Sequence, residues 1–525
     1  MITYLRNICF PLIILLIGAG FSSSTPSEIK NDKRITITLF QLNDIYEISP
    51  LNNGAVGGMA RAATVISDLE KENRNTYVVV AGDFLSPTAI GTLPYNKAGD
   101  KMAGIQMVET MNQAGVDLVT FGNHEFDIKQ KQLSAAINAS KFEWVSSNVT
   151  ETSTGKPFNK ISGNDTTPLP ITKIVSFKDE DGTTVKIGFF AITIITDKSP
   201  NPQYEYYDDY INSAGKAVAA LKGNCDILVA ITHLSLSDDK KLAAAFPEIN
   251  MIIGGHEHIN SYNFVGNTII AKADANEKSG YIHYLTYDHR TKKTDITSRL
   301  IGITNSIPED SVTGKVVDKW NGIADSVLHA VKKMQPCLII DSVSTPLDGT
   351  EAGIRTQQTN LGNLICESFR DAAGMNTDLA MMNSGSIRLD DYLSGYITEY
   401  DIFRVLPFDG NVMVKKMKGS FIDSLIQTNP ARANIGSYLQ FSGISFCNDT
   451  AVINSAPINH DKWYTVALND FLGNNLQDGL KVFPTETIPM PQPSTVQSAL
   501  IKKIKSIAAP ISDDVQNNDL IVPCY

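Results

Sequence analysis

GNHEFD at residues 122–127 and GGHEH at residues 254–258 are the two stretches that decide the fold of this 525-residue chain. Each follows an apolar run, VDLVTF before the first stretch and INMII before the second. Buried strands that alternate with helical stretches are typical of an α/β layered fold, and such folds gather functional groups in the loops at the carboxyl ends of their strands. The two stretches therefore predict an α/β fold with a polar site at one edge of its sheets.

Three other predicted strands end in the same kind of residue. ITITLFQL runs into Asn43-Asp44, TYVVVAG runs into Asp83, and DILVAIT runs into His233. A single Asp after a strand usually belongs to a turn, and a single His is usually a structural residue whose hydrogen bonds are made by its neighbours. Five strand ends of this kind are nonetheless hard to assign to packing. The candidate metal ligands are Asp44, Asp83, Asn123, His233, His256 and His258.

This mixed set of oxygen and nitrogen donors predicts two divalent metal ions, with Zn, Mn, Co, Mg or Fe as candidates in preference to calcium. Two ions ~3.5 to 4 Å apart would fix a phosphate oxygen, lower the pKa of a bound water, and stabilise both the attacking and the leaving oxygen of an in-line displacement. The predicted chemistry is therefore hydrolysis of a phosphoester.

Charge and the N-terminal segment restrict the partners and the compartment. The formal net charge of -11 disfavours a nucleic-acid polymer as a partner, because phosphate backbones bind cationic surfaces. Arg6 precedes an apolar run over residues 8–17, and small residues follow up to Ser24, which is typical of a cleavable signal peptide over residues 1–24. The alternative is an uncleaved anchor. No later segment is predicted to span a membrane, so the chain is expected to be secreted or periplasmic.

The hydrophobic pattern divides the rest of the chain into three parts. Residues 25–310 carry all of the candidate ligands. Residues 311–334 place apolar side chains at helical spacing and predict a linker helix. Residues 335–525 form a second α/β region without a further metal-type cluster.

Both large parts contain motifs of a known family. NDIYE at 43–47, GDFLSPT at 82–88, GNHEFD and GGHEH resemble the calcineurin-like metallophosphoesterase domain. NLGNLIC at 360–366, NSGSIR at 383–388 and NDFLG at 469–473 resemble the C-terminal domain of the 5'-nucleotidase family. The resemblance implies a four-layer metallophosphoesterase β-sandwich domain, joined by a helix to a smaller α/β domain that binds the substrate.

The resemblance also implies a role for each donor. Asp83 would bridge the two metals, Asp44 and His258 would complete one site, and the other site would contain Asn123, His233 and His256. The implied catalytic residues are His124 and Asp127. His124 would act as an electrostatic stabiliser or as a general acid for the leaving oxygen, and Asp127 would orient its imidazole.

One position departs from the family. The first motif usually reads Asp-x-His, whereas this chain has Asp44-Ile45-Tyr46. A phenol is a poor ligand for zinc, although a phenolate binds iron(III) and other hard cations. Two alternatives follow: Tyr46 ligates the first metal and changes its identity, or Tyr46 withdraws and water takes its place.

The second half supplies groups suited to a nucleotide. By resemblance, Arg355 and Arg388 face the phosphate or the ribose, where guanidinium groups bind strongly. Phe408 and Phe471 match a pair of rings that stack on the base. The remaining substrate-binding candidates are Asn383 and Asp478, although the loop between Phe471 and Asp478 departs from the family.

These observations predict a secreted two-metal phosphohydrolase that releases phosphate from nucleotides, most of all from nucleoside 5'-monophosphates. Nucleoside di- and triphosphates, UDP-sugars and cyclic nucleotides are alternative substrates for the same mechanism. A non-catalytic nucleotide-binding scavenger and a sulfur-compound hydrolase are alternatives of other classes. His124 and Asp127 argue against the scavenger, and the two aromatic rings argue against the sulfur substrate.

Overall fold

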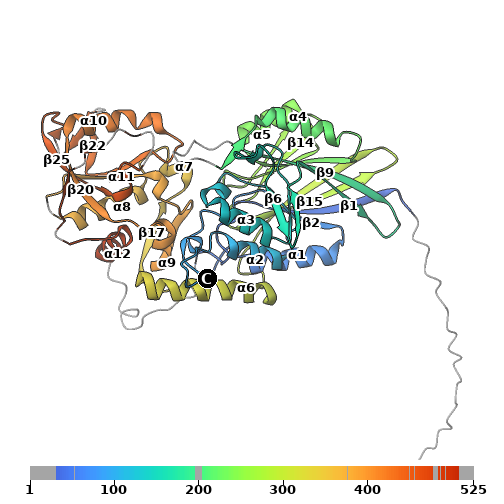
Figure 1. Ribbon diagram of the computed structural model, residues 1–525, viewed down its shortest axis with the longest axis horizontal. Coiled ribbons are helices and arrows are strands. Elements are labelled where there is room, and N and C mark those ends of the chain that lie inside the picture. The colour runs from blue at the N-terminus through green and yellow to red at the C-terminus, as the bar shows by residue number, and fades with distance from the viewer. Residues whose placement is uncertain are drawn as a thin grey trace, which may run out of the picture.

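The computed structural model describes residues 31–507 apart from residues 53, 195–203, 375, 448–449, 455, 477–479, 481–482, 485 and 491. The predicted signal peptide at residues 1–24 lies outside this part of the chain. Figure 1 shows two α/β domains side by side, with helix α6 (Ser311–Val327) along one edge of the pair. Within the described residues, no helix combines the length and the apolar character needed to cross a bilayer.

Two stacked sheets form the centre of the N-terminal domain. In the described residues, the first has the strand order β16-β15-β1-β2-β3-β4 and the second the order β13-β14-β12-β11-β9-β8. The first sheet consists of β1 (Arg34–Leu42), β2 (Thr76–Val80), β3 (Leu118–Val119), β4 (Glu143–Trp144), β15 (Ser279–Asp288) and β16 (Lys293–Gly302). The second consists of β8 (Thr172–Lys178), β9 (Thr184–Thr193), β11 (Ile227–His233), β12 (Met251–Gly254), β13 (Ser261–Val265) and β14 (Thr268–Lys272).

The alternation of side chains along β1 explains the layers. Ile35, Ile37 and Leu39 pack into the core between the two sheets, whereas Phe40 and Leu42 pack beneath the helices. The helices on the first sheet are α1 (Met59–Glu72), α2 (Ile105–Ala114) and α3 (Gln130–Ala139), and those on the second are α4 (Tyr210–Leu221) and α5 (Leu236–Ala245). This four-layer sandwich confirms the predicted fold class.

A polar bridge connects the two sheets. The buried Gln41 amide on β1 donates hydrogen bonds to the carbonyls of Gly254 (3.0 Å) and Ala271 (2.9 Å) in the second sheet. Its Oε1 lies 3.0 Å from Nε2 of the buried His283, whose Nδ1 lies 2.7 Å from Ser298 Oγ. Since Gln41 Oε1 can only accept, His283 donates through Nε2. Burial lowers the pKa of His283 to about 3, so the ring is neutral.

The predicted linker helix lies against the N-terminal domain. It appears as α6 followed by one short π-helical turn at Leu328–Lys332. Val317, Trp320 and Ala324 pack into the same core as α1 and α2, and the Trp320 indole donates to Glu109 Oε2 at 2.9 Å. The helix is therefore anchored to the first domain along its length.

The C-terminal domain has one main sheet between helices. Its strand order in the described residues is β21-β18-β25-β20-β26. These strands are β18 (Leu379–Asn383), β20 (Val412–Lys418), β21 (Leu439–Ser442), β25 (Trp463–Asn469) and β26 (Thr487–Ile488). One face packs on α8 (Asn360–Ala373) and α12 (Val496–Ile507), and the other packs on α10 (Gly419–Thr428).

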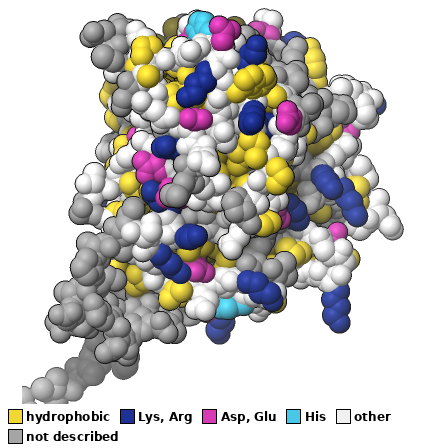
Figure 2. All heavy atoms as spheres, turned by 90° about the vertical axis from the view of Figure 1, so that its left-hand side faces the viewer, with side chains coloured by type: hydrophobic (Ala, Val, Ile, Leu, Met, Phe, Trp, Pro, Cys, Tyr) yellow, Lys and Arg dark blue, Asp and Glu magenta, His cyan; other side chains and the backbone are white. Residues whose placement is uncertain are grey.

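A separate strand pair, β17 (Ile339–Asp348) and β19 (Tyr392–Thr398), lies on the side toward the N-terminal domain. Cys337, just before β17, is disulfide-bonded, whereas Cys225 and Cys366 are free. The opposite end of this domain carries Lys and Arg side chains spread among Asp, Glu and small apolar areas (Figure 2).

Candidate active site

The predicted ligands from both sheets meet at the carboxyl ends of their strands. Asp44, Asp83 and His233 each offer one ligand atom, and these atoms all lie within 4.8 Å of one another. His233 Nε2 is 3.1 Å from Asp83 Oδ2 and 3.7 Å from Asp44 Oδ1. All three side chains are buried. Two buried carboxylates at this distance require a positive charge between them.

Two atoms of the predicted ligands are available to a metal. His233 Nδ1 is held by the carbonyl of Ala81 at 2.7 Å, which leaves Nε2 facing the carboxylates. Asn123 Oδ1 is also buried and unpaired. An imidazole nitrogen and an amide oxygen left open beside two carboxylates match the ligands of a divalent transition metal. The residues present therefore fit the metal that the sequence predicts.

Glycines in the motifs allow the loops to approach one another. A Cβ on Gly122 would lie 2.2 Å from Asp83 Oδ1, and a Cβ on Gly255 would lie 2.6 Å from the carbonyl oxygen of Ala81. Both distances are too short for any side chain. Glycine is therefore required at positions 122 and 255 because the ligand loops pack closely there.

The backbone at four predicted ligands is in the left-handed region. The φ angles are 54° at Asp44, 56° at Asp83, 91° at His256 and 56° at His258. Residues other than glycine rarely adopt this conformation, and such strain is concentrated at functional sites. The fold holds these side chains in place at an energetic cost.

Burial and the neighbouring charges shift the pKa values of two histidines in the cluster. Burial opposes protonation of His233, but Asp83 and Asp44 together raise its pKa to about 9. Burial and the neighbouring His233 lower the pKa of His256 to about 4. His256 is therefore neutral and free to donate a lone pair, while the carboxylates hold a proton on His233 that a bound cation would replace.

His124 and Asp127 form a pair beside the cluster. They belong to the short 3-10 helix His124–Asp127, and His124 Nδ1 lies 2.7 Å from Asp127 Oδ2. The His124 backbone N–H donates to Asp83 Oδ1 at 2.7 Å, which places the imidazole next to the candidate ligands. Burial opposes protonation, yet Asp127 and Asp83 raise the pKa of His124 overall. The pair has the geometry of an oriented, proton-bearing histidine.

Glu125 is a functional residue that the sequence analysis missed. Its buried carboxylate accepts hydrogen bonds from the backbone N–H groups of Asp83, Phe84 and Leu85, at 2.8, 2.7 and 3.0 Å, and from that of Gly122 at 2.6 Å. It therefore ties the loop of Asp83 to the loop of Asn123. The sequence offered one indication of this role. GNHEFD contains an acidic residue, Glu125, that was assigned neither as a metal ligand nor as a catalytic residue.

Tyr46 lies inside the cluster. Its Oη is 3.0 Å from His258 Nε2, 3.1 Å from Asp83 Oδ2 and 3.4 Å from Asp44 Oδ1. The side chain is buried, and its backbone N–H is held by Asn276 Oδ1 at 3.2 Å. Tyr46 therefore contacts the candidate ligands Asp44, Asp83 and His258.

The C-terminal domain reaches this cluster across the domain boundary. Asp390 contacts His258 Nδ1 through its carboxylate. The Tyr400 hydroxyl donates to Glu47 Oε2 at 2.9 Å, and Arg404 Nε lies 3.7 Å from Glu47 Oε1. None of these contacts could be read from the separate motifs.

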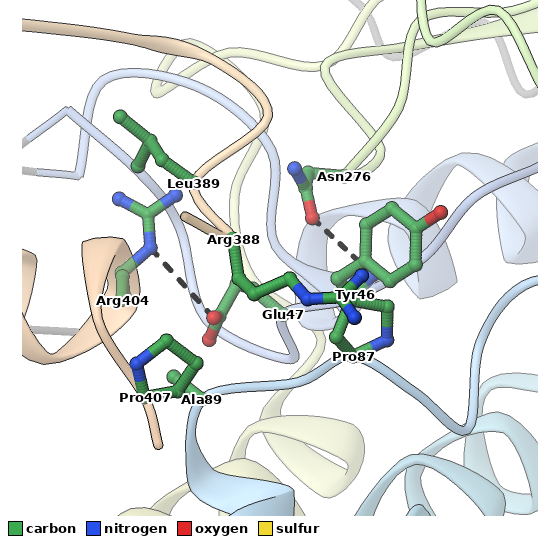
Figure 3. A pocket seen from close by; sticks show the side chains of 9 residues that line it. All are labelled: Tyr46, Glu47, Pro87, Ala89, Asn276, Arg388, Leu389, Arg404 and Pro407. Atoms are coloured by element: carbon green, nitrogen blue, oxygen red, sulfur yellow. Dashed lines mark hydrogen bonds and ion pairs between the residues drawn. The ribbon is translucent and has the colours of Figure 1, made fainter. Parts of the chain in front are cut away.

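A small pocket lies at this boundary. Figure 3 shows Tyr46 and Asn276 on one side and the Glu47 carboxylate turned toward Arg404 on the other, with Arg388 extending between them toward Tyr46 and Pro87. An adjoining pocket is lined by Tyr46, His124, His258, Arg388 and Asp390. The candidate catalytic histidine and a C-terminal arginine therefore line one cavity.

The predicted base-binding rings, Phe408 and Phe471, lie in neighbouring segments of the C-terminal domain. The Arg388 guanidinium is 5.5 Å from the centre of the Phe408 ring. Phe408 and Phe471 are 43% and 40% exposed, so both rings are open to a ligand. Their segments are adjacent because the Asp470 carboxylate accepts a hydrogen bond from the Asn411 backbone N–H at 2.9 Å.

Arg355 and Asn383 are less open than the two rings. Arg355 pairs with Glu351 at the end of α7 (Glu351–Ile354) and keeps an unpaired Nε. Asn383 is buried and accepts hydrogen bonds from Ser386 Oγ (2.9 Å) and Asn469 Nδ2 (3.1 Å), so it stabilises the turn before Arg388. Asp478 lies outside the described residues.

Comparison with known proteins agrees with this geometry. Residues 37–260 match the calcineurin-like phosphoesterase family, and residues 341–485 match the 5'-nucleotidase C-terminal domain. The chain is 25% identical to the 5'-nucleotidase of Bos taurus, over 88% of this chain and 85% of the relative. It is also 25% identical to protein UshA of Yersinia enterocolitica (87% and 88% covered) and 23% identical to the snake venom 5'-nucleotidase of Crotalus adamanteus (88% and 84%).

Solved structures share the fold. A 5'-nucleotidase precursor from Thermus thermophilus superposes with a TM-score of 0.66 at 21% identity, covering 90% of this chain and 96% of that one. The sulfate thiohydrolase SoxB of the same organism gives a TM-score of 0.62 at 14% identity, covering 90% and 94%.

The four-layer sandwich, with Asp, Asn and His gathered at its strand ends, defines a metallophosphoesterase, a class of hydrolases. Because a 5'-nucleotidase C-terminal domain follows it in the same chain, the protein belongs to the 5'-nucleotidase family.

Proposed function

We propose that the protein is a secreted or periplasmic two-metal enzyme that hydrolyses nucleoside 5'-monophosphates to nucleosides and phosphate. The observation that carries the proposal is the cavity that His124 of one domain and Arg388 of the other both line. A phosphate there would meet a proton donor and a guanidinium together. The export signal is supported by residues 1–24 and by a relative that is a venom protein.

In this proposal two bound metals would supply Lewis-acid chemistry to the phosphate and to the attacking water. Asp44, Asp83, Asn123, His233, His256 and His258 would hold them, with Asp83 shared. His124 would place its Nε2 proton near the leaving oxygen, because Nδ1 is occupied by Asp127. Arg388 and Arg355 would neutralise the phosphate or contact the ribose.

The base would bind at the surface formed by Phe408 and Phe471. Stacking on aromatic rings stabilises a nucleobase by roughly 1 to 3 kcal/mol and tolerates different bases. Asn383 would position the turn that carries Arg388 rather than contact the substrate, given its internal hydrogen bonds. Asp478 is proposed as a ribose or base contact.

The test is phosphate release from AMP, ADP, ATP, UDP-glucose and cyclic AMP by purified protein, after chelation and re-addition of Zn, Mn, Co, Mg or Fe. We expect AMP to be the best substrate and chelation to abolish turnover. No release from any nucleotide with any metal would retire the proposal.

His124→Ala tests the catalytic assignment. Because general acid catalysis contributes about 10²- to 10⁴-fold, we expect kcat to fall by that factor while nucleotide binding stays within about twofold. His289→Ala, an exposed histidine far from the cluster, is the matched control. Equal losses in both variants would contradict the assignment.

A further inference from the structure

Lys272, the last residue of β14, carries a charged side chain into the interior of the N-terminal domain. It is only 1% exposed. Its Nζ donates hydrogen bonds to the carbonyl oxygens of Leu234 at 2.6 Å and Gly255 at 2.8 Å. A buried ammonium group is costly unless its protons find acceptors, so the groups around Lys272 show what this side chain holds in place.

The two carbonyls belong to two different ligand loops. Leu234 directly follows His233, and Gly255 directly precedes His256. The centres of the two imidazole rings lie 5.4 Å apart. Both histidines are predicted ligands of the same metal, so a single ammonium group ties together the backbone of two side chains that must reach one ion.

Two carboxylates fix the position of this ammonium group. Asp239, a buried residue of α5, places Oδ2 2.8 Å from Lys272 Nζ, and its Oδ1 accepts a hydrogen bond from Thr232 Oγ1 at 2.7 Å. Glu257 contacts Lys272 Nζ through Oε2 and accepts a hydrogen bond from the Leu236 backbone N–H through Oε1. Leu236 is the first residue of α5, so the helix, β14 and the GGHEH loop are joined at one point.

The GGHEH loop needs such an anchor because its backbone is strained. His256 and His258, on either side of Glu257, have φ angles of 91° and 56°. Residues other than glycine keep the left-handed conformation only where neighbouring contacts hold them in it. A Cβ on Gly254 would lie 3.0 Å from Lys272 Cε, so the loop packs directly on this side chain. Without the ammonium group the loop would lose two of the contacts that hold it.

We propose that Lys272 is a positioning residue for the metal that His233 and His256 bind. It acts through the two loops: by holding the carbonyl next to each histidine, it sets the spacing of the two imidazoles. The inference rests on the proposed function for the presence of the metal. It adds to the site a residue that lies outside all of the sequence motifs.

The first experiment is a calorimetric zinc titration of the full chain after chelation, for the unaltered protein and for Lys272→Met. Methionine keeps the length of the side chain and removes the ammonium group. We expect one of two zinc equivalents to bind about 10- to 100-fold more weakly, the usual loss when a group that orients a metal ligand is removed. Unchanged affinity for both equivalents would overturn the proposal.

Lys160→Met is the matched control. Lys160 on β6 (Asn159–Ser162) also donates to backbone carbonyls, those of Ser140 at 2.6 Å and Phe142 at 3.2 Å, but these residues belong to no ligand loop. Both variants should lower the temperature of thermal unfolding, whereas only Lys272→Met should weaken zinc binding. Equal losses of affinity would mean that Lys272 contributes only general stability, which would refute a positioning role.

Hydrogen exchange of the metal-free protein gives a second readout. The His256 N–H donates to Asp44 Oδ2 at 3.0 Å, so its exchange should be slow in the unaltered chain and faster in Lys272→Met. If Lys272→Met fails to fold, Asp239→Asn takes its place, because asparagine keeps the shape of the side chain and removes a charge that holds the ammonium group. A smaller change of the same kind is expected there, and no change would contradict the proposal.

These outcomes are separate from the test of the proposed function. Faster exchange and weaker zinc binding in Lys272→Met, in a protein whose unaltered form releases no phosphate, would contradict only the proposed function. An active unaltered protein whose exchange and zinc affinity are the same with and without the ammonium group would contradict only the role of Lys272.

Discussion

The placement of single charged groups at this site depends on backbone donors as much as on other charges. The buried Glu125 carboxylate accepts hydrogen bonds from four backbone N–H groups that belong to two ligand loops. Burial and the nearby Asp83 nonetheless raise its pKa to about 7. A glutamine in place of Glu125 would direct its own NH₂ donor toward some of these backbone N–H groups.

We therefore expect Glu125→Gln to destabilise the N-terminal domain by about 2 to 4 kcal/mol, because buried donors left without acceptors are costly. Metal affinity should fall with it, since the loops of Asp83 and Asn123 lose their common anchor. The measurement is urea unfolding together with a zinc titration. Glu143→Gln, a half-exposed carboxylate paired with Lys173, is the control, and equal effects would refute the role of Glu125.

At the scale of elements, a neutral histidine contacts the glutamine that connects the two sheets. His283 on β15 contacts Gln41 on β1, whose amide donates to the carbonyl of Gly254, the first residue of GGHEH. Protonation of His283 would add an N–H at Nδ1, which faces the Ser298 hydroxyl in a buried place.

This arrangement predicts a pH dependence. The pKa of His283 is about 3 in the folded protein, against ~6.5 for an exposed imidazole. Below pH ~6.5 the unfolded chain therefore binds a proton that the folded chain does not. The stabilisation is complete above that pH and is lost as the pH falls toward 3, at about 1.4 kcal/mol per pH unit.

His283→Gln should therefore reduce the slope of stability against pH between about pH 4 and 6, even though the variant is less stable at pH 7. Denaturant unfolding at several pH values measures this slope. His289→Gln at the exposed end of the same hairpin should leave it unchanged. A slope in His283→Gln equal to that of the unaltered chain would contradict the prediction.

The helix α11 (Asp470–Gly473) presents Phe471 at the proposed base site. Because stacking contributes about 1 to 3 kcal/mol per base, Phe471→Ala should weaken AMP binding by roughly 5- to 150-fold and change kcat little. Phe446→Ala, at a 60% exposed ring on β22 (Ile444–Cys447), is the control. Unchanged binding in Phe471→Ala would show that the base binds elsewhere.

Sequence alone predicted the elements that rest on local patterns. The strand ends at Asp44, Asp83 and His233 could be predicted because each polar residue directly follows an apolar run typical of a buried strand. Asp390 was not visible, because its contact with His258 depends on how two domains dock. Glu125 lay within a quoted motif, but its role depends on loop conformations that only the close approach of glycines allows.

At the scale of the whole molecule, the two domains contact each other through buried polar groups. Glu47 and Arg404 are 5% and 7% exposed, and Tyr400 adds a hydrogen bond to the same carboxylate. Burial raises the pKa of Glu47, although Arg404 and Tyr400 lower it in part. Removing one member of such a pair leaves an uncompensated buried charge, which costs about 3 to 5 kcal/mol.

Arg404→Leu should accordingly shift the protein toward a more open arrangement of its domains. Small-angle X-ray scattering should record a larger radius of gyration, and AMP should bind more weakly because Arg388 and His124 no longer line one cavity. Arg290→Leu, in an exposed ion pair, should change neither property. An unchanged scattering profile for Arg404→Leu would contradict the role of this contact.

The contact between Asp390 and His258 makes the metal centre and the domain arrangement parts of one equilibrium. If docking of the C-terminal domain raises the affinity of His258 for a cation, then the bound cation must favour docking by the same factor, because coupling between two binding events is reciprocal. Metal supply would then set how often the domains are closed, and a chelator would open the protein before it unfolds it.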